Sequence, residues 1–242
     1  ENSGWDRGLT DYLYGGDTNY RLQQEIVLGM GGARMAGALG LRVNVYHMNE
    51  GHAALLTLAL LERQMGGGPQ AAATESDIAQ VRPQCVFTTH TPVPAGHDRF
   101  SSEQSIRILG GERTARLQNL GCFKDDMLNM TLLALRFSRY ANGVALQHGK
   151  VSQAMFPEFA IDSITNGVHA PTWISEPVRQ LLDKHIPAWR RDNLYLRNAI
   201  DLPENEILRA HATAKEALLA EVGQRTGLVL NPRVLTLGFA RR

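Results

Sequence analysis

The sequence predicts an α/β fold, a doubly wound sheet of parallel strands, and two observations carry this prediction. Short β-favouring runs alternate along the chain with longer apolar runs at helical spacing. Polar loops also follow the strands directly, and several of them contain a histidine. In open α/β sheets ligands bind beyond the carboxyl ends of parallel strands. The pattern therefore also predicts a site at one edge of the sheet.

The individual elements follow from residue spacing and from the residues at their ends. Asp17 can accept the free N–H groups of a helix and predicts the start of the first long helix, whose apolar residues recur on one face as far as Leu39. Gly- and Pro-rich stretches such as 66–74 indicate surface connections. We expect helices over 18–39, 53–61, 75–81, 127–140 and 203–222, an amphipathic helix between Trp173 and Trp189, and strands over 43–48, 85–89, 161–165 and 234–239.

Three glycines, Gly29, Gly31 and Gly32, lie inside the first predicted helix. A dinucleotide-binding fingerprint would need its glycines between a strand and a helix, so this reading is rejected. Close helix packing explains the glycines better.

Composition excludes several classes of protein. The 242 residues are 43% hydrophobic and 20% charged, which is enough to bury a substantial core. A formal charge of +1 gives no basic field for nucleic acid, and the absence of an apolar run of about eighteen residues predicts no membrane span. Cys85 and Cys122 form no spaced pair, which indicates a reduced, cytoplasmic protein.

The two ends suggest an internal piece of a longer protein. The chain starts at Glu1, and the expected strand 234–239 has no helix after it to cover its faces.

The first candidate site residues are Glu50 and His52, which stand between a strand and an apolar helix. The alternative is that Asn49 and Glu50 only cap that helix. Further strand ends carry His90, His148 and His169, and each alone is more often a hydrogen-bonded structural histidine than a catalyst.

The chemistry that these loops favour is sugar binding. Glu50 and His52 lack the His-Glu-x-x-His spacing of a zinc helix, so no metal is predicted, and no Gly-x-Ser-x-Gly elbow of a serine hydrolase is present. Stiff loops with neutral polar groups suit a pocket that hydrogen-bonds many hydroxyls, where each unpaired group costs roughly 1–3 kcal/mol.

Several separate motifs, in register along nearly the whole chain, resemble the α-glucan (glycogen/maltodextrin) phosphorylases of the shorter prokaryotic type, glycosyltransferase family 35. The motifs are Leu-Tyr-Gly-Gly-Asp at 13–17, Tyr-Arg-Leu-Gln-Gln-Glu at 20–25, Asn-Glu-Gly-His-Ala at 49–53, Thr-Thr-His-Thr-Pro-Val-Pro-Ala-Gly-His at 88–97, Ser-Arg-Tyr-Ala-Asn-Gly-Val at 138–144, Thr-Asn-Gly-Val-His at 165–169 and Gly-Phe-Ala-Arg-Arg at 238–242.

The resemblance implies a two-domain GT-B glycosyltransferase with Rossmann-like domains. Such an enzyme cleaves terminal α-1,4-linked glucose with inorganic phosphate, gives α-glucose 1-phosphate, and uses pyridoxal phosphate. Residues 1–232 would be the later part of the N-terminal, glucan-binding domain, and residues 233–242 the first strand of the C-terminal domain. The lysine that holds pyridoxal phosphate would lie beyond residue 242, so the chain alone is expected to be inactive.

The resemblance also implies roles for individual residues. His90 and Thr91 would contact the glucose at the cleavage site, and Glu50 and His52 would line the pocket beside its anomeric centre. Gly15, Gly16 and Asp17 would match the loop that gates substrate access, and Arg241 and Arg242 would bind the substrate phosphate. Gln147 and Lys150 depart from the Lys-Leu-His-Gly-Glu-like run expected there, which leaves the role of that helix start open.

Two alternatives remain. One is a nucleotide-sugar-dependent glucan synthase of the same architecture, and the other is a non-catalytic glucan-binding protein. The expected partners are an α-1,4-glucan and inorganic phosphate, and the sequence allows for a homo-oligomer.

Overall fold

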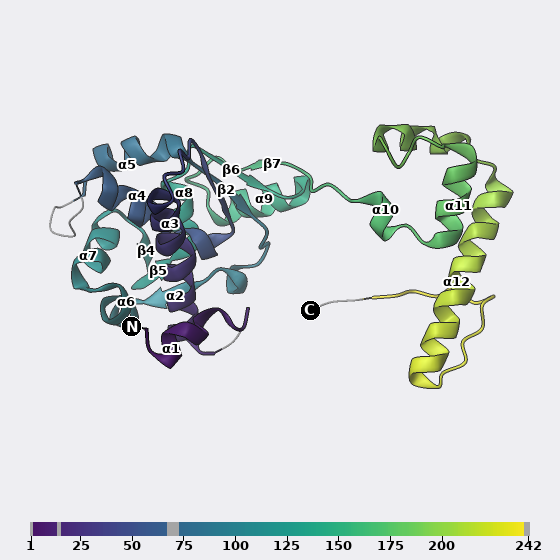
Figure 1. Cartoon of the computed structure of the whole chain (residues 1–242), viewed down its shortest axis with the longest axis horizontal. Coiled ribbons are helices and arrows are strands. Elements are labelled where there is room, and N and C mark those ends of the chain that lie inside the picture. Colours follow the sequence, from purple (N-terminus) through teal and green to yellow (C-terminus); the bar gives the residue numbers. More distant parts are fainter. Residues whose placement is uncertain (1, 14–15, 67–72, 240–242) are drawn as a thin grey trace. The chain divides into compact units, whose positions relative to one another are not determined.

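The computed structural model describes residues 2–13, 16–66 and 73–239 and divides the chain into two compact units, Glu1–Asn166 and Gly167–Arg242. Figure 1 shows both. The expected domains, 1–232 and 233–242, stay a prediction about the longer protein.

A parallel sheet organises the first unit and confirms the predicted α/β class. Its four strands are β1 (Tyr46–Asn49), β2 (Cys85–Thr89), β6 (Tyr140–Gly143) and β7 (Asp162–Ser163). They pair in the order β1-β2-β6-β7, all parallel, with Met48 opposite Phe87 and Phe87 opposite Ala141. The carboxyl ends of the described strands therefore meet at one edge.

The described helices of the first unit are α1 (Gly4–Arg7), α2 (Thr18–Ile26), α3 (Gly32–Ala38), α4 (Leu56–Gln64), α5 (Glu75–Val81), α6 (Ser102–Leu109), α7 (Gly111–Asn119), α8 (Met130–Arg136) and α9 (Leu146–Met155). All of them except α1 and α3 contribute buried residues. Helix α4 is buried along almost its whole length, and its Leu58 and Leu61 side chains are fully enclosed. Since a helix that is apolar all round belongs in a core, α4 holds the centre of the unit.

The first predicted helix is helical over nearly its whole range but not uniform. A π-helical segment, Val27–Gly31, separates α2 from α3. A Cβ on Gly29 would lie 2.7 Å from the backbone N of Leu56, so Gly29 lets this segment touch α4. Gly32 has nothing within 4 Å of that position. Close packing therefore explains Gly29 and does not explain Gly32.

A second, antiparallel sheet was not predicted. It consists of β3 (Arg99–Ser101), β5 (Met127–Asn129) and β4 (Phe123–Lys124), in that order. The expected helix 127–140 is wrong at both ends. Leu128 pairs with Phe100 and the helix begins at Met130, and it ends at Arg136, before strand β6 begins at Tyr140. Asn129 caps it by accepting the N–H of Leu132 at 3.0 Å.

The second unit is helical. It contains α10 (Ala170–Trp173), α11 (Glu176–His185), a 3-10 segment (Asn193–Asp201) and α12 (Glu204–Thr226). Leu182, Ile186 and Trp189 form its apolar cluster, which confirms the amphipathic helix between the two tryptophans. The expected strand 234–239 is wrong: these residues form no strand, and Leu235 and Phe239 are exposed, because no described segment pairs with them.

None of the described helices combines the length and hydrophobicity needed to cross a lipid bilayer.

Candidate functional site at the sheet edge

Glu50 connects the carboxyl ends of β1 and β2. Its carboxylate is buried and accepts hydrogen bonds from the backbone N–H of His90, from Thr89 Oγ1 at 3.2 Å and from the N–H of Gly51 at 3.3 Å. Its backbone has φ 68° and ψ 171°, a conformation that is almost restricted to glycine. The hydrogen bonds hold Glu50 in this conformation, and Glu50 in turn fixes the backbone at His90.

The loop that begins at His90 folds back on itself. Thr91 N–H donates to Thr89 Oγ1 at 3.4 Å, and Pro94–Gly96 form a 3-10 turn. A Cβ on Gly96 would lie 2.5 Å from Thr91 Cγ2, so only glycine fits there without a shift. His90 itself is exposed. The loop therefore presents an accessible imidazole on a fixed backbone.

A charged cluster, defined as Arg21, Glu25, His52 and Asp98, lies beside this loop. Arg21 Nη2 donates to Asp98 Oδ2 at 3.1 Å, and Arg21 Nε lies 3.1 Å from Glu25 Oε1. His52 Nδ1 lies 2.9 Å from Asp98 Oδ2 and 3.8 Å from Glu25 Oε1. Glu25 is buried, whereas His52 and Asp98 are partly exposed. The cluster ties helix α2 to the segment after β1 and to the end of the His90 loop.

The burial and pairing of these groups shift their pKa values in opposite directions. Burial raises the pKa of Glu25 to about 8, and the hydrogen bond to Asp98, with help from Glu25, raises the pKa of His52 to about 9. Burial alone would raise the pKa of Asp98, but hydrogen bonds from His52 and Glu25 and the charge of Arg21 hold it well below its usual range. These shifts favour the neutral form of Glu25, the ionised form of Asp98 and the cationic form of His52.

Three members of this cluster have the separation of metal ligands: one donor atom each of Glu25, His52 and Asp98 lies within 4.8 Å of the others. However, the guanidinium of Arg21 reaches both carboxyl groups at 3.1 Å and already supplies positive charge there. A metal ion would have to displace this guanidinium. That no metal binds here stays a prediction, and the pairing of Arg21 with both carboxyl groups supports it.

A hydrogen-bonded row crosses three strands next to this edge. Thr88 Oγ1 donates to Asn142 Oδ1 at 2.9 Å, and His47 Nε2 lies 2.8 Å from the same Thr88 oxygen. Because the hydroxyl has a single proton, which it gives to Asn142, His47 must donate through Nε2. The row fixes the tautomer of His47 and the register of β1, β2 and β6.

The structure joins Glu50 to His90 and pairs His52 with Asp98, which ends the His90 loop, but gives other predicted residues local roles. His148 is buried and its Nδ1 accepts the Val144 N–H at 3.1 Å, so it holds the turn between β6 and α9. Asp17 Oδ1 accepts the Tyr20 N–H at 2.9 Å as the cap of α2, and this hydrogen bond lowers the pKa of Asp17. Gly16 has φ 74°, and a Cβ on it would lie 2.6 Å from Tyr20 Cγ.

The remaining predicted residues are not part of this site as the structure describes it. His169 belongs to the second unit, where its Nδ1 lies 2.6 Å from Thr172 Oγ1. Gly15, Arg241 and Arg242 lie outside the described residues.

Sequence reasoning gave no role to Arg21, Glu25 or Asp98. Two signals were available: Arg21 and Glu25 are four residues apart on one helix face, and Asp98 ends the His90 loop. Neither signal shows that these residues meet, because the contact depends on how α2 packs against the sheet edge.

The fold and these side chains define an α/β protein with a polar, histidine-containing site at the carboxyl edge of a parallel sheet. No family model matches the chain. Curated relatives do. The chain is 34% identical to the maltodextrin phosphorylase of Thermococcus litoralis over its whole length, which is 32% of that protein. It is 37% identical to the glycogen phosphorylase of Mycobacterium tuberculosis over 98% of its length, which is 32% of that protein.

A third relative, the glycogen phosphorylase of Aquifex aeolicus, is 31% identical over the whole chain and 40% of its own length. The homologues of this chain are thus the maltodextrin and glycogen phosphorylases, which confirms the resemblance seen in the motifs. The chain spans about a third of the length of the curated relatives that it matches.

Proposed function

We propose that this chain carries the glucan-binding side of the active site of a 1,4-α-glucan phosphorylase (EC 2.4.1.1). Such a glycosyltransferase releases terminal α-1,4-linked glucose from glycogen or maltodextrin as α-glucose 1-phosphate. The names of the homologues support this proposal. The observation that carries it is the hydrogen bond from the His90 backbone to Glu50, which fixes the backbone that carries an exposed imidazole at the sheet edge.

In this proposal His90 and Thr91 contact the hydroxyl groups of the terminal glucose. An imidazole can donate or accept a hydrogen bond, as a sugar hydroxyl can, so His90 can orient the ring without covalent chemistry. Glu50 acts by positioning His90, since its carboxylate is already occupied by three donors. His52 would line the pocket beside the anomeric centre, with Arg21 and Asp98 as its partners.

The substrate phosphate and the access loop complete the proposal. Arg241 and Arg242 would bind the phosphate, because a guanidinium fork matches two of its oxygens. Gly15, Gly16 and Asp17 would gate the glucan, with Asp17 as the start of helix α2. We further propose a cytoplasmic enzyme that takes inorganic phosphate as its second substrate.

The residues present here do not fit the pyridoxal phosphate that the resemblance implies. A Schiff-base lysine must approach the aldehyde from a sheltered site, and the chain has four lysines. Lys184 donates to Glu206 at 2.9 Å and Lys215 to the carbonyl of Val234 at 2.6 Å. Lys124 and Lys150 are exposed. We therefore assign no cofactor residue in this chain and no step through the cofactor.

Glucan binding can be tested apart from turnover by calorimetric titration of the chain with maltoheptaose. His90→Ala is expected to weaken binding about tenfold, the cost of one or two hydrogen bonds left unmade. His211→Ala is the matched control, because His211 is an exposed histidine on α12. Equal affinities for the His90→Ala variant and the unchanged chain would contradict the role of His90.

Turnover is tested with maltodextrin, inorganic phosphate and pyridoxal phosphate. The chain alone should release no α-glucose 1-phosphate above background, because it offers no anchored cofactor. Product formation by this chain would refute that assignment and would point to one of its own lysines.

A further inference from the structure

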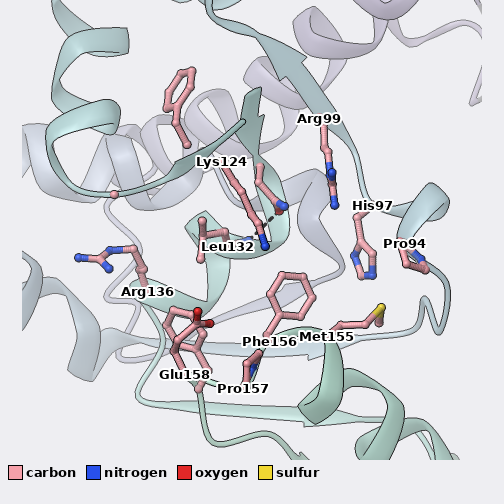
Figure 2. Close-up of a pocket in the computed structure, with 14 residues that line it drawn as sticks. Pro94, His97, Arg99, Lys124, Leu132, Arg136, Met155, Phe156, Pro157 and Glu158 are labelled. Atoms are coloured by element: carbon pink, nitrogen blue, oxygen red, sulfur yellow. Dashed lines mark hydrogen bonds between the residues drawn. The ribbon is translucent and has the colours of Figure 1, made fainter. Parts of the chain in front are cut away.

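A cavity lies against the His90 loop, and none of the predicted sugar-site residues is among those that line it. It has a volume of about 600 Å³. The loop contributes Pro94 and His97, and the wall continues through the antiparallel sheet and the end of α9 (Figure 2). A volume of this size accommodates a small organic molecule.

The charged side chains of the cavity are mostly cationic. Arg99, Lys124 and Arg136 line it, against a single carboxylate, Glu158. Arg136 also pairs with Glu75, whereas Arg99 and Lys124 form no ion pair within the described part of the chain. Figure 2 shows Arg99 and Lys124 extending toward the space that His97 also faces. The cavity therefore offers a net positive charge to a ligand.

His97 is an unpartnered polar group in the same wall. It is 6% exposed, its Nδ1 lies 2.7 Å from Thr131 Oγ1, and its ring meets Phe156 edge to face at 5.5 Å. Its Nε2 is buried and has no hydrogen-bond partner in the described part of the chain. A buried ring nitrogen without a partner is costly and needs an explanation, and a bound ligand provides one.

The rest of the wall is apolar and aromatic. Phe123, Leu132, Met155, Phe156 and Phe159 face the cavity together with Pro94 and Pro157. Such a lining favours a ligand with a ring or an aliphatic body rather than a bare inorganic ion.

From the cavity, its two unpaired cations and the orphaned Nε2 of His97, we infer that this protein has a second ligand site, which binds a small organic anion such as a phosphate ester with an apolar body. The anionic group pairs with Arg99 and Lys124 through charge-assisted hydrogen bonds, and the body packs on the aromatic wall. His97 and Arg99 flank Asp98 of the charged cluster. Occupation of the cavity therefore also orders the loop that starts at His90. The inference does not depend on the proposed phosphorylase activity.

The test uses phenyl phosphate as the probe, titrated into the 242-residue chain by calorimetry. Inorganic phosphate and phenol are separate arms that carry only the charge or only the ring. Phenyl phosphate should bind at least about tenfold tighter than either arm, and Lys124→Glu should weaken it by about tenfold or more. Arg63→Glu, an exposed cation on α4, is the matched control and should leave the affinity within about twofold.

A second measurement locates the ligand without any substitution. In chain labelled with ¹⁵N-histidine, phenyl phosphate should shift the Nε2 resonance of His97 and leave that of His211 in place. Hydrogen exchange over residues 90–98 should slow in the same sample. The inference is overturned if phenyl phosphate does not bind, if inorganic phosphate binds equally well, if both charge reversals weaken binding alike, or if the His97 signal does not move.

Discussion

Replacement of Glu50 tests whether one buried carboxylate holds the sheet edge. Glu50 Oε1 accepts two donors, the part-buried His90 N–H and the buried Thr89 hydroxyl. In Glu50→Ala both lose their acceptor, and because a stranded donor costs roughly 1–3 kcal/mol while the hydroxyl can rotate, we expect a loss of about 2–4 kcal/mol. Glu50→Gln can keep its carbonyl oxygen at the Oε1 position, so it should stay within about 1 kcal/mol of the unchanged chain.

Glu50→Gly separates the hydrogen bonds from the backbone conformation. Glycine loses the same carboxylate, but it relaxes a conformation (φ 68°, ψ 171°) that costs other residues of order 1–3 kcal/mol. The greater freedom of glycine in the unfolded chain offsets about 0.5–1 kcal/mol of this gain. The glycine variant should therefore be about 1–2 kcal/mol more stable than the alanine variant.

The assay is urea unfolding, monitored by hydrogen exchange in a peptide that spans β2 and His90. This readout reports on the first unit alone. The expected order of stability is unchanged chain, glutamine, glycine, alanine. If glycine and alanine are equally unstable, the backbone at Glu50 is not strained. If alanine stays within about 0.5 kcal/mol of the unchanged chain, the carboxylate does not hold the His90 backbone.

Three further predictions concern packing, pH and reactivity. Gly29→Ala should destabilise the chain by about 1–3 kcal/mol, since its Cβ would meet the backbone of α4, whereas Gly32→Ala should stabilise it by about 0.5–1 kcal/mol because its Cβ lies in open space. Thermal unfolding measures both changes in stability, and changes of the same sign would contradict the packing. The folded state raises the pKa of Glu25 from 4.5 to about 8 and that of His52 from 6.5 to about 9, so it binds more protons than the unfolded state between these values, and stability should fall as pH rises through both ranges. Glu25→Gln should flatten the fall in stability below pH 8. If urea unfolding gives the same dependence of stability on pH for this variant as for the unchanged chain, the assignment is refuted. Both free cysteines are buried with thiol pKa values raised to about 12, so iodoacetamide should label neither at pH 8 until urea is added, as mass spectrometry of the native chain would show.

Local patterns predicted the elements whose residues decide their own structure. The strand 85–89 and the helix 75–81 appear at the predicted residues as β2 and α5, and the helix 203–222 appears as α12. In each case the pattern of apolar residues lies within the segment itself, and for α5 a capping box begins at Thr74, directly before it. The two helices need no distant partner to form, whereas the strand 85–89 is completed by its pairing with β1 and β6.

The failures have the opposite cause. Met127–Asn129 are apolar and continue a helical run, yet they form β5 because Arg99–Ser101 pair with them from across the chain. Residues 234–239 have strand-forming composition but no described partner, and they form no strand. A strand depends on hydrogen bonds to another segment, so its own residues cannot decide whether it forms.

For the candidate site, the sequence by itself determined which polar residues end the strands: Glu50, His52 and His90. This follows from the alternation of apolar runs and loops, which is a local property of the chain. Only the tertiary structure decided what these residues do. It turned the Glu50 carboxylate onto the His90 backbone and brought Arg21 and Asp98 to His52. The contacts join residues up to 77 positions apart in the chain, and such contacts arise from the packing of helices on the sheet, which no short stretch of sequence encodes.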